Sequence, residues 1–279
     1  MRKRQTFLAV LLLWPVLAAA QPGPDYPPWP ATVHMSYSGS ALGFEVMKLE
    51  AAVSIGESGY HVGVAFRTVG LLSIFARSEM QTTVWGDWRG GTPAPWHFWA
   101  SGLLRGAARE TLIDYDNGWP TVRTLIPAND GEREEVPEPA RGETIDTLSA
   151  VAFLIRRVAD TGRCDGRVRV FDGRRLTEIG AHTVGQLVLA DGEAGAYAGE
   201  GVRCDFTGRQ LAGFLLDDSA WQHQPHDGAA WLARAVPGGP PVPVRLTFQA
   251  RWVGEINLVL KSAGPGPLES APLLREGPR

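Results

Sequence analysis

The chain has 279 residues, of which 44% are apolar, so it can bury a substantial core. Its 27 basic and 30 acidic residues give a formal net charge of −3 at pH 7. The first twenty residues hold three of the basic residues and no acidic one, and without them 24 basic residues stand against 30 acidic ones, a balance of −6. A surface for nucleic acid or for an anionic membrane needs a basic field, so this scattered, negative balance argues against both.

The first twenty residues, MRKRQTFLAVLLLWPVLAAA, have the organisation of a secretory signal peptide. Basic residues precede an apolar run at 7–17, and Ala18–Ala20 supply the small residues that a signal peptidase accepts. The run is shorter than the roughly 20 apolar residues of a spanning helix. We therefore expect residues 1–20 to be cleaved before Gln21, and no transmembrane span. Residues 21–30 contain five prolines and predict an extended leader.

Cys164 and Cys204 are the two cysteines of the chain. In an oxidising compartment an even pair is most simply one disulfide, and neither residue belongs to a CxxC motif. Two thiols alone also make a poor zinc site. We therefore predict a disulfide between Cys164 and Cys204.

Alternation of apolar and polar residues with a period of two predicts strands along most of the chain. It occurs at 33–38, 60–67 and 79–84, and again in a long segment at 242–260. Asn117–Gly118 separates two extended segments and predicts a tight hairpin, because both central positions of such a turn need a positive φ angle. The pattern predicts a meander of antiparallel strands in a single domain over residues 31–261, followed by a flexible tail at 262–279.

Two segments inside the predicted domain depart from the strand pattern. Residues 127–144, PANDGEREEVPEPARGET, carry three prolines and six acidic residues and predict an exposed surface loop. From Asp146 to Val158 apolar residues recur at helical spacing, with Asp146 as a candidate N-cap and Gly162 as the stop. We expect this helix to close one face or the mouth of the sheet.

Several short motifs, taken in their order, resemble a known family. They are Thr68–Leu72, Asp146–Ala150, Val170–Arg175, Gly213–Phe214 after Cys204, and the segment from Pro243 to Gly254. Together they resemble the exported bacterial family catalogued as domain of unknown function 3108, from about Val33 to Leu260. The resemblance implies a periplasmic protein rich in antiparallel strands, with a strongly curved sheet and a helix in its concavity, similar to the half-barrel of the periplasmic lipoprotein carriers. It implies no activity, cofactor or catalytic residue.

The stretch VFDGRRL, from Val170 to Leu176, places a carboxylate and two guanidiniums beside a glycine. Asp172–Gly173 favours a tight turn, so one interpretation is a hairpin corner with Arg174 and Arg175 at its solvated rim. The other interpretation turns one of these arginines inward to hold a carboxylate or phosphate group. We name Asp172, Arg174 and Arg175 as candidate ligand contacts and favour the corner.

Tryptophan is concentrated between residues 85 and 119, a stretch that holds Trp85, Trp88, Trp96, Trp99 and Trp119. Such density either lines a concave hydrophobic site or fills the core of a wide, curved sheet. We favour the core and name Trp96 and Trp99 as candidate ligand contacts.

Signals for catalysis are weak. The chain has no G-x-S-x-G elbow and no phosphate-binding loop with its lysine. An envelope hydrolase could work through an acid pair such as Asp114 with Asp116, or through His223 with Asp227. The proline in His223-Gln224-Pro225-His226 excludes the helical face on which two histidines bind zinc in HExxH proteins.

The sequence as a whole predicts a mostly β protein: a strongly curved antiparallel sheet or incomplete barrel with one main α-helix packed on or in it. We expect an exported, periplasmic binding or carrier module for an envelope amphiphile such as a lipid, without nucleic acid, metal or cofactor. The alternatives are an envelope hydrolase, or a structural partner in an envelope complex that uses the 127–144 loop as its contact.

Overall fold

The structure is a computed structural model that describes residues 32–129, 131–217, 220–251 and 253–266. Its helices are α1 (Leu72–Phe75), α2 (Glu138–Arg141) and α3 (Thr147–Thr161), with a short 3-10 helix at Ala220–His223. Its strands are β1 (Thr32–Ala41), β2 (Phe44–Ile55), β3 (Gly59–Thr68), β4 (Glu79–Arg89), β5 (Thr92–Leu104), β6 (Ala107–Asp116), β7 (Trp119–Ile126), β8 (Gly166–Phe171), β9 (Leu176–Ala194), β10 (Tyr197–Ala212), β11 (His226–Ala233), β12 (Val242–Ala250) and β13 (Gly254–Gly266).

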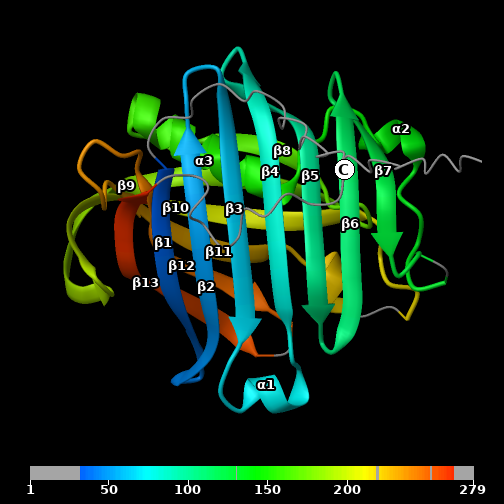
Figure 1. Cartoon of the computed structure of the whole chain (residues 1–279), viewed down its shortest axis with the longest axis horizontal. Coiled ribbons are helices and arrows are strands. Elements are labelled where there is room, and N and C mark those ends of the chain that lie inside the picture. The colour runs from blue at the N-terminus through cyan, green and yellow to red at the C-terminus, as the bar shows by residue number, and fades with distance from the viewer. Residues whose placement is uncertain (1–31, 130, 218–219, 252, 267–279) are drawn as a thin grey trace, which may run out of the picture.

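All thirteen strands belong to one sheet in the order β7-β6-β5-β4-β3-β2-β1-β13-β12-β11-β10-β9-β8. Every neighbouring pair is antiparallel, so two meanders, β1–β7 and β8–β13, are joined by the pairing of β1 with β13. In Figure 1 the first meander lies in front and strands of the second cross behind it. The predicted fold, a strongly curved antiparallel sheet or incomplete barrel with one main helix, is confirmed.

The inner face of the first meander is built by the strand period of two. Tyr60 in β3 contacts α3, because its hydroxyl lies 2.7 Å from Ser149 Oγ. Val62 therefore also faces inward, and the register pairs it with Val84, then Phe98, then Ile113 across β4, β5 and β6. Each of these side chains is at most 4% exposed, so the row forms a continuous apolar floor beneath α3.

The predicted helix is confirmed as α3, and both of its ends are capped as expected. Asp146 is the N-cap, with Oδ1 accepting hydrogen bonds from the backbone N–H groups of Leu148 and Ser149, each at 2.9 Å. Gly162 ends the helix with a φ of +68°, a left-handed conformation that glycine adopts at little cost. The helix contacts strands β2 to β5 and β8, so it fills the concavity of the sheet. Its buried residues are Leu148, Ser149, Ala152, Ile155 and Val158.

Residues 127–144 are anchored, which differs from the expected exposed loop. Val136 is 4% exposed and Thr144 1%. The backbone N–H of Glu134 donates to Phe214, and that of Leu216 donates to Glu132, at 2.8 and 3.1 Å. The composition predicted exposure correctly for most of the acidic side chains. The main-chain hydrogen bonds that hold the segment cannot be predicted from composition, because every residue type can make them. The segment closes the gap between the end strands β7 and β8.

The sheet extends beyond the predicted C-terminal end of the domain. β13 extends to Gly266 and pairs with β1 there, so residues 262–266 belong to the sheet rather than to the expected tail. The predicted signal peptide and proline-rich leader lie outside the described residues. Among the helices of the described residues, none is long and apolar enough to cross a membrane.

The predicted disulfide between Cys164 and Cys204 is present. Cys164 lies between α3 and β8, and Cys204 lies in β10, opposite Thr183 of β9. The backbone N–H of Cys164 also donates to Thr183 Oγ1 at 2.9 Å. The bridge therefore crosses β9 and fixes the connection after α3 to the second meander.

Replacing both cysteines, Cys164→Ser with Cys204→Ser, is expected to lower the free energy of unfolding by about 3 to 4 kcal/mol, because the bridge closes a loop of 40 residues in the unfolded chain. Urea denaturation under oxidising conditions measures the loss. A reducing agent serves as the control: it should lower the wild-type midpoint to that of the variant and leave the variant unchanged. Equal wild-type and variant midpoints in oxidising buffer would contradict the prediction.

Acidification changes the stability contributions of two buried groups in opposite directions. Burial raises the pKa of Asp146 to about 6, although hydrogen bonds from Ser149 and Leu148 work against that rise. Its stabilising contribution is therefore present below its unfolded pKa and lost as the pH rises through 6. Burial lowers the pKa of His61, on the outer face of β3, to about 3. Its contribution is present above its unfolded pKa near 6.5 and lost as the pH falls through 3.

Asp146→Asn keeps an oxygen that can cap α3 but removes the titration. On acidification from pH 6 to pH 4 the wild-type chain gains stability from Asp146 and loses stability from His61. The variant loses the contribution of His61 and has no gain from residue 146. We expect the free energy of unfolding of the variant to fall more steeply on acidification, diverging from wild type by about 2 kcal/mol between pH 6 and pH 4. Urea denaturation at several pH values measures this divergence, and Asp160→Asn, an exposed change on the same helix, is the matched control. Parallel wild-type and Asp146→Asn curves would refute the assignment.

Candidate functional site

The VFDGRRL stretch forms the corner between β8 and β9. Asp172 Oδ1 accepts hydrogen bonds from the backbone N–H groups of Arg174 and Arg175, at 3.0 and 2.7 Å, which closes a tight turn. Gly173, with a φ of +89°, packs on the inner face of β6, where an added β-carbon would lie 2.8 Å from Thr111 Cγ2. The glycine of this stretch is thus required both by its backbone angle and by the close approach of the corner to β6.

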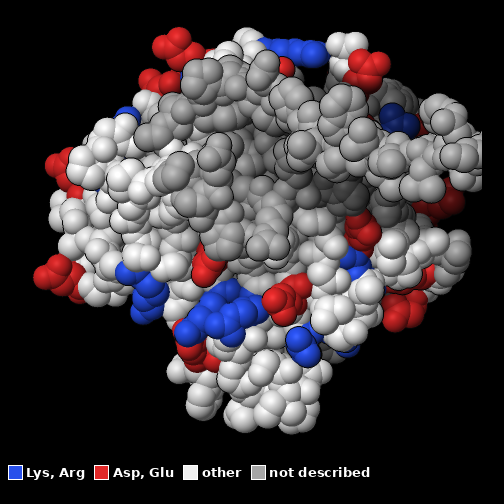
Figure 2. All heavy atoms as spheres, viewed as in Figure 1, with Lys and Arg blue, Asp and Glu red and all other residues white. Residues whose placement is uncertain are grey.

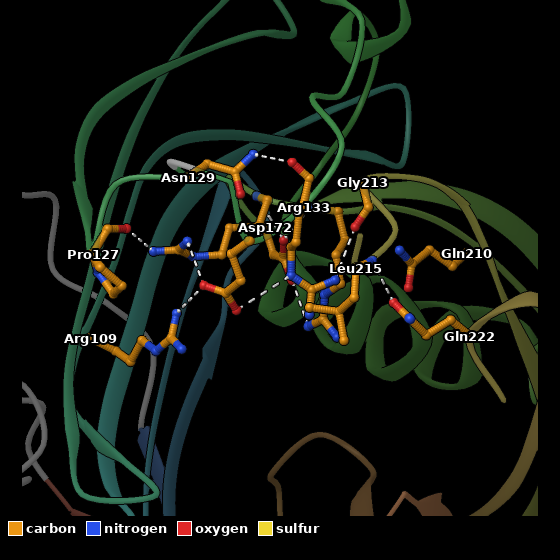
Figure 3. Close-up of polar contacts among 12 residues, drawn as sticks. Arg109, Pro127, Asn129, Arg133, Asp172, Gln210, Gly213, Leu215 and Gln222 are labelled. Carbon is orange, nitrogen blue, oxygen red and sulfur yellow. Dashed lines mark hydrogen bonds and ion pairs between the residues drawn. The ribbon is translucent and has the colours of Figure 1, made fainter. Parts of the chain in front are cut away.

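The corner brings together side chains from three distant parts of the chain, and Figure 3 shows them. β6 contributes Arg109, the segment after β7 contributes Glu132 and Arg133, and the corner contributes the rest. We call this group the arginine cluster. Its members are Arg109, Arg133, Arg174 and Arg175, with the carboxylates Glu132 and Asp172.

The two carboxylates of the arginine cluster are held differently. Asp172 pairs closely with Arg175, whose Nη2 lies 2.6 Å from Oδ2. Although burial works against ionisation, the charge and hydrogen bonds of Arg175 lower the pKa of Asp172. Glu132 is shared by three guanidiniums at longer range: Arg109 at 3.3 Å, and Arg133 and Arg174 at 3.9 Å. One carboxylate is therefore the main counter-charge for three partly buried arginines.

The arginine cluster has more positive charge than it can neutralise internally. Four guanidiniums face two carboxylates, and the side chains of Arg174 and Arg133 are only 11% and 14% exposed. Burial, followed by repulsion from Arg109, lowers the pKa of Arg174. Within the described residues, Arg109 Nε and Arg174 Nη1 are buried and lack a hydrogen-bond acceptor. Buried donors normally have acceptors, so the cluster is chemically suited to an additional anion.

Exposed apolar side chains differ in how close they lie to the arginine cluster. Ile126, which ends β7 beside Pro127, is 44% exposed, but it pairs with Glu110 and so lies on the outer face of the sheet, opposite to Arg109. Leu216, whose backbone N–H donates to Glu132 O, is 57% exposed. The main-chain oxygen of Pro127 accepts a hydrogen bond from Arg174 Nη2. Leu216 therefore brings exposed apolar surface to the segment that carries Glu132.

The two sequence interpretations of this stretch both describe part of it. Asp172 and Arg175 form the hairpin corner with its half-exposed arginine, as the favoured interpretation expected. Arg174 turns inward, as the other interpretation expected of one arginine. Sequence reasoning missed Arg109, Glu132 and Arg133, because they reach the corner only through the closure of the sheet.

Trp96 and Trp99 do not join the arginine cluster. Trp99 pairs with Leu112 on the outer face of the sheet, where its Nε1 donates to Glu110 Oε1 at 3.2 Å. Trp96 lies against Trp85 on that same face, with ring centroids 6.1 Å apart. Arg109 lies on the inner face with Thr111 and Ile113, by the strand period of two. The five candidate ligand contacts therefore divide between opposite faces of the sheet.

Trp88 shows that one tryptophan does reach the interior. Its ring contacts Tyr60 at 4.7 Å and lies under the guanidinium of Arg156 from α3 at 5.5 Å. Its Nε1 donates to Gly56 O at 3.1 Å. The core interpretation therefore describes Trp88, whereas Trp85, Trp96 and Trp99 cover the outer face.

The acid pairs considered for a hydrolase are engaged in structural contacts. Asp114 accepts from Arg123 Nε at 2.8 Å and lies 3.0 Å from His97 Nδ1. Burial opposes ionisation, but these hydrogen bonds outweigh it and lower the pKa of Asp114, the reverse of what a general acid needs. Asp116 accepts from the side chain of Asn117 in the hairpin turn. Both carboxylates are therefore engaged in structural hydrogen bonds.

The histidine segment is likewise built from stacking and hydrogen bonds. His223 stacks on Phe214 with ring centroids 4.3 Å apart, and His226 stacks on Trp221 at 3.7 Å. Asp227 accepts a hydrogen bond from Thr207 at 2.6 Å. The described part of the chain contains no group of three or more His, Cys, Asp or Glu residues placed to hold a metal ion.

A groove of about 380 Å³ lies beside the C-terminal half of α3. Val158 of α3, Val188 of β9 and Leu232 of β11 are among its lining residues, with Glu200 and Arg234 as its charged groups. Ten or more residues of β9 separate it from the corner, a distance of roughly 30 Å or more along the strand. One small ligand therefore cannot contact both the groove and the arginine cluster.

Comparison with known proteins gives a family but no activity. A "beta-barrel-like protein of domain of unknown function DUF1849" from Brucella abortus shares 12% identity over 85% of this chain and 98% of its own, with a TM-score of 0.49. A protein of Parabacteroides distasonis ATCC 8503, described as a putative lipoprotein, shares 8% identity over 85% and 97%, with a TM-score of 0.32. No curated protein matches the sequence significantly. The model of the family described as "Protein of unknown function (DUF3108)" matches residues 32–260, so the chain belongs to this family.

Proposed function

We propose that this chain is a non-catalytic binding or carrier module that acts in the periplasm after export. Its ligand is an amphiphile of the cell envelope with an anionic head group, a phosphate or a carboxylate. The head group binds the arginine cluster, and the apolar part lies over the neighbouring exposed side chains. The disulfide supports export, because such bonds persist in oxidising compartments.

The charge excess of the arginine cluster is the observation that carries this proposal. Guanidiniums that repel one another in a partly buried site cost stability unless an anion compensates them. The planar fork of Arg109 and Arg174 suits the paired oxygens of a phosphate or carboxylate. Glu132 occupies the centre of the three arginines at distances of 3.3 to 3.9 Å, so a ligand anion would compete with it or join it.

The ligand site proposed here lies at the rim of the sheet, not inside the concavity. The inner face of β3 to β5 packs against α3 and contributes to one continuous core. Leu216, whose backbone N–H donates to Glu132 O, instead offers exposed apolar surface near the arginines. An amphiphile can therefore place its charged and apolar parts on adjoining surfaces at the rim.

We expect dodecyl phosphate, kept below its micellar concentration, to bind the wild-type chain and dodecyl maltoside, with a neutral head, to bind far more weakly. Isothermal titration calorimetry measures both, with inorganic phosphate as the head group alone. Arg109→Gln with Arg174→Gln is expected to weaken dodecyl phosphate binding at least tenfold, since hydrogen bonds to charged groups contribute roughly 1.5 to 3 kcal/mol each. Glu132→Gln is expected to tighten it several-fold, because the competing carboxylate is gone.

Arg209→Gln is the matched control, because Arg209 is a 59% exposed arginine whose ion pair with Glu178 spans 3.9 Å, away from the cluster. It should leave the affinity unchanged, and circular dichroism with a thermal melt verifies that each variant folds. The proposal fails if the wild-type chain binds neither phosphate compound. It fails equally if Glu132→Gln weakens binding as much as the arginine changes do, since the cluster would then act only as a structural unit.

A further inference from the structure

Exposed large apolar side chains gather at one end of the first meander. The turn between β1 and β2, the connection from β3 through α1 to β4, and the turn between β5 and β6 all lie at this end, because β1, β3 and β5 run in the same direction. We call the group the apolar tip. Its members and their exposed fractions are Leu42 84%, Phe44 68%, Leu71 70%, Ile74 72%, Phe75 84% and Leu104 41%.

Main-chain contacts hold the three parts of the apolar tip side by side. The backbone N–H of Val69 donates to Val46 O at 3.0 Å, which joins the α1 connection to the start of β2. The backbone N–H of Gly106 donates to Arg77 O at 2.8 Å, which joins it to the β5–β6 turn. In Figure 1 the turn between β1 and β2 and the helix α1 project at the bottom of the sheet. The six side chains therefore form one projecting surface.

The turn at Leu42 and the helix α1 do not place their side chains in the core. Leu42 has a φ of +52° in a two-residue turn before Gly43, a conformation that favours asparagine or glycine and costs energy for leucine. α1 is a single turn without a buried residue. Soluble proteins rarely expose so many large apolar side chains together unless the patch meets a membrane or another apolar surface.

Basic side chains border the apolar tip. Lys48 and Arg67 are exposed and pair directly across β2 and β3, next to the pair that ends this ladder at the tip. Arg77 follows α1, and its side chain is 69% exposed. Figure 2 shows blue basic side chains directly above the white projection, with acidic ones beside them. An apolar end bordered by basic residues has the charge pattern of a segment that enters the headgroup region of a phospholipid layer.

We propose that the apolar tip inserts into the surface of a phospholipid bilayer and seats the protein on it. Phe44, Ile74 and Phe75 enter the boundary between headgroups and acyl chains, and Lys48 with Arg67 contacts lipid phosphates. The negative charge of the whole chain argues against binding driven by charge, but here apolar burial provides the main attraction. β7 also ends at this end of the sheet, so the arginine cluster faces the same way as the tip.

Flotation with vesicles tests the tip, using the exported chain from Gln21 so that the apolar residues 7–17 do not contribute. The wild-type chain should float with vesicles of phosphatidylethanolamine and phosphatidylglycerol. Phe44→Ser with Phe75→Ser is expected to lower its partition coefficient at least tenfold, because two large apolar side chains no longer enter the lipid. The wild-type chain should bind phosphatidylcholine vesicles more weakly than these anionic vesicles. Lys48→Gln with Arg67→Gln should weaken binding to the anionic vesicles and should not change binding to the phosphatidylcholine vesicles.

Val184→Ser with Val188→Ser is the matched control, because these β9 valines are 52% and 73% exposed but lie outside the tip. It should float like wild type. Arg109→Gln with Arg174→Gln should also float normally, whereas the tip variant should still bind dodecyl phosphate, so the two proposals fail separately. The tip proposal is overturned if the wild-type chain stays in the aqueous fraction, or if the valine control loses as much binding as the tip variant. It is overturned too if sedimentation shows that the tip instead joins two copies of the chain.

Discussion

The two end strands of the sheet, β7 and β8, impose the main constraint on this structure, because end strands carry main-chain groups that need partners. Ile145 supplies some of them by pairing in parallel with Val170 of β8. Farther along the same seam, Arg133 pairs with Leu215 just beyond β10. The β8–β9 corner then packs on the inner face of β6 through Gly173. This closure concentrates four arginines on two carboxylates, so the candidate site is a product of how the sheet ends meet.

The sequence predicted the local parts of this fold and not its closure. Strand alternation, the capped helix from Asp146 and the cysteine pair are local or compositional signals, and the structure confirms all three. Arg109 and Glu132 reach Arg174 only because distant strands close into one sheet, which no local pattern encodes. Aromatic density around Trp85 and Trp99 was visible, but choosing the face of the sheet requires the register between strands. Main-chain hydrogen bonds likewise anchor residues 127–144 despite their acidic, proline-rich composition.

The polar interior beside α3 explains how one helix is held in one orientation. Asp146 binds two backbone N–H groups of α3 and lies 2.5 Å from Ser149 Oγ, which in turn lies 2.7 Å from the hydroxyl of Tyr60. Burial raises the pKa of Tyr60, so its hydroxyl keeps its proton. The chain of polar contacts fixes the helix on β3, and apolar packing then fills the concavity.

The pairing of β1 with β13 links the first described strand to the last, and Ser36 meets Ser262 across 226 positions of sequence. During synthesis, β1 can pair with β2 at once, but its other edge has to wait until the final strand has emerged. Contacts over such separations are slow to form, and an unpaired edge promotes association with other chains. The pairing that joins the two meanders is thus expected to form late, after all thirteen strands have been synthesised.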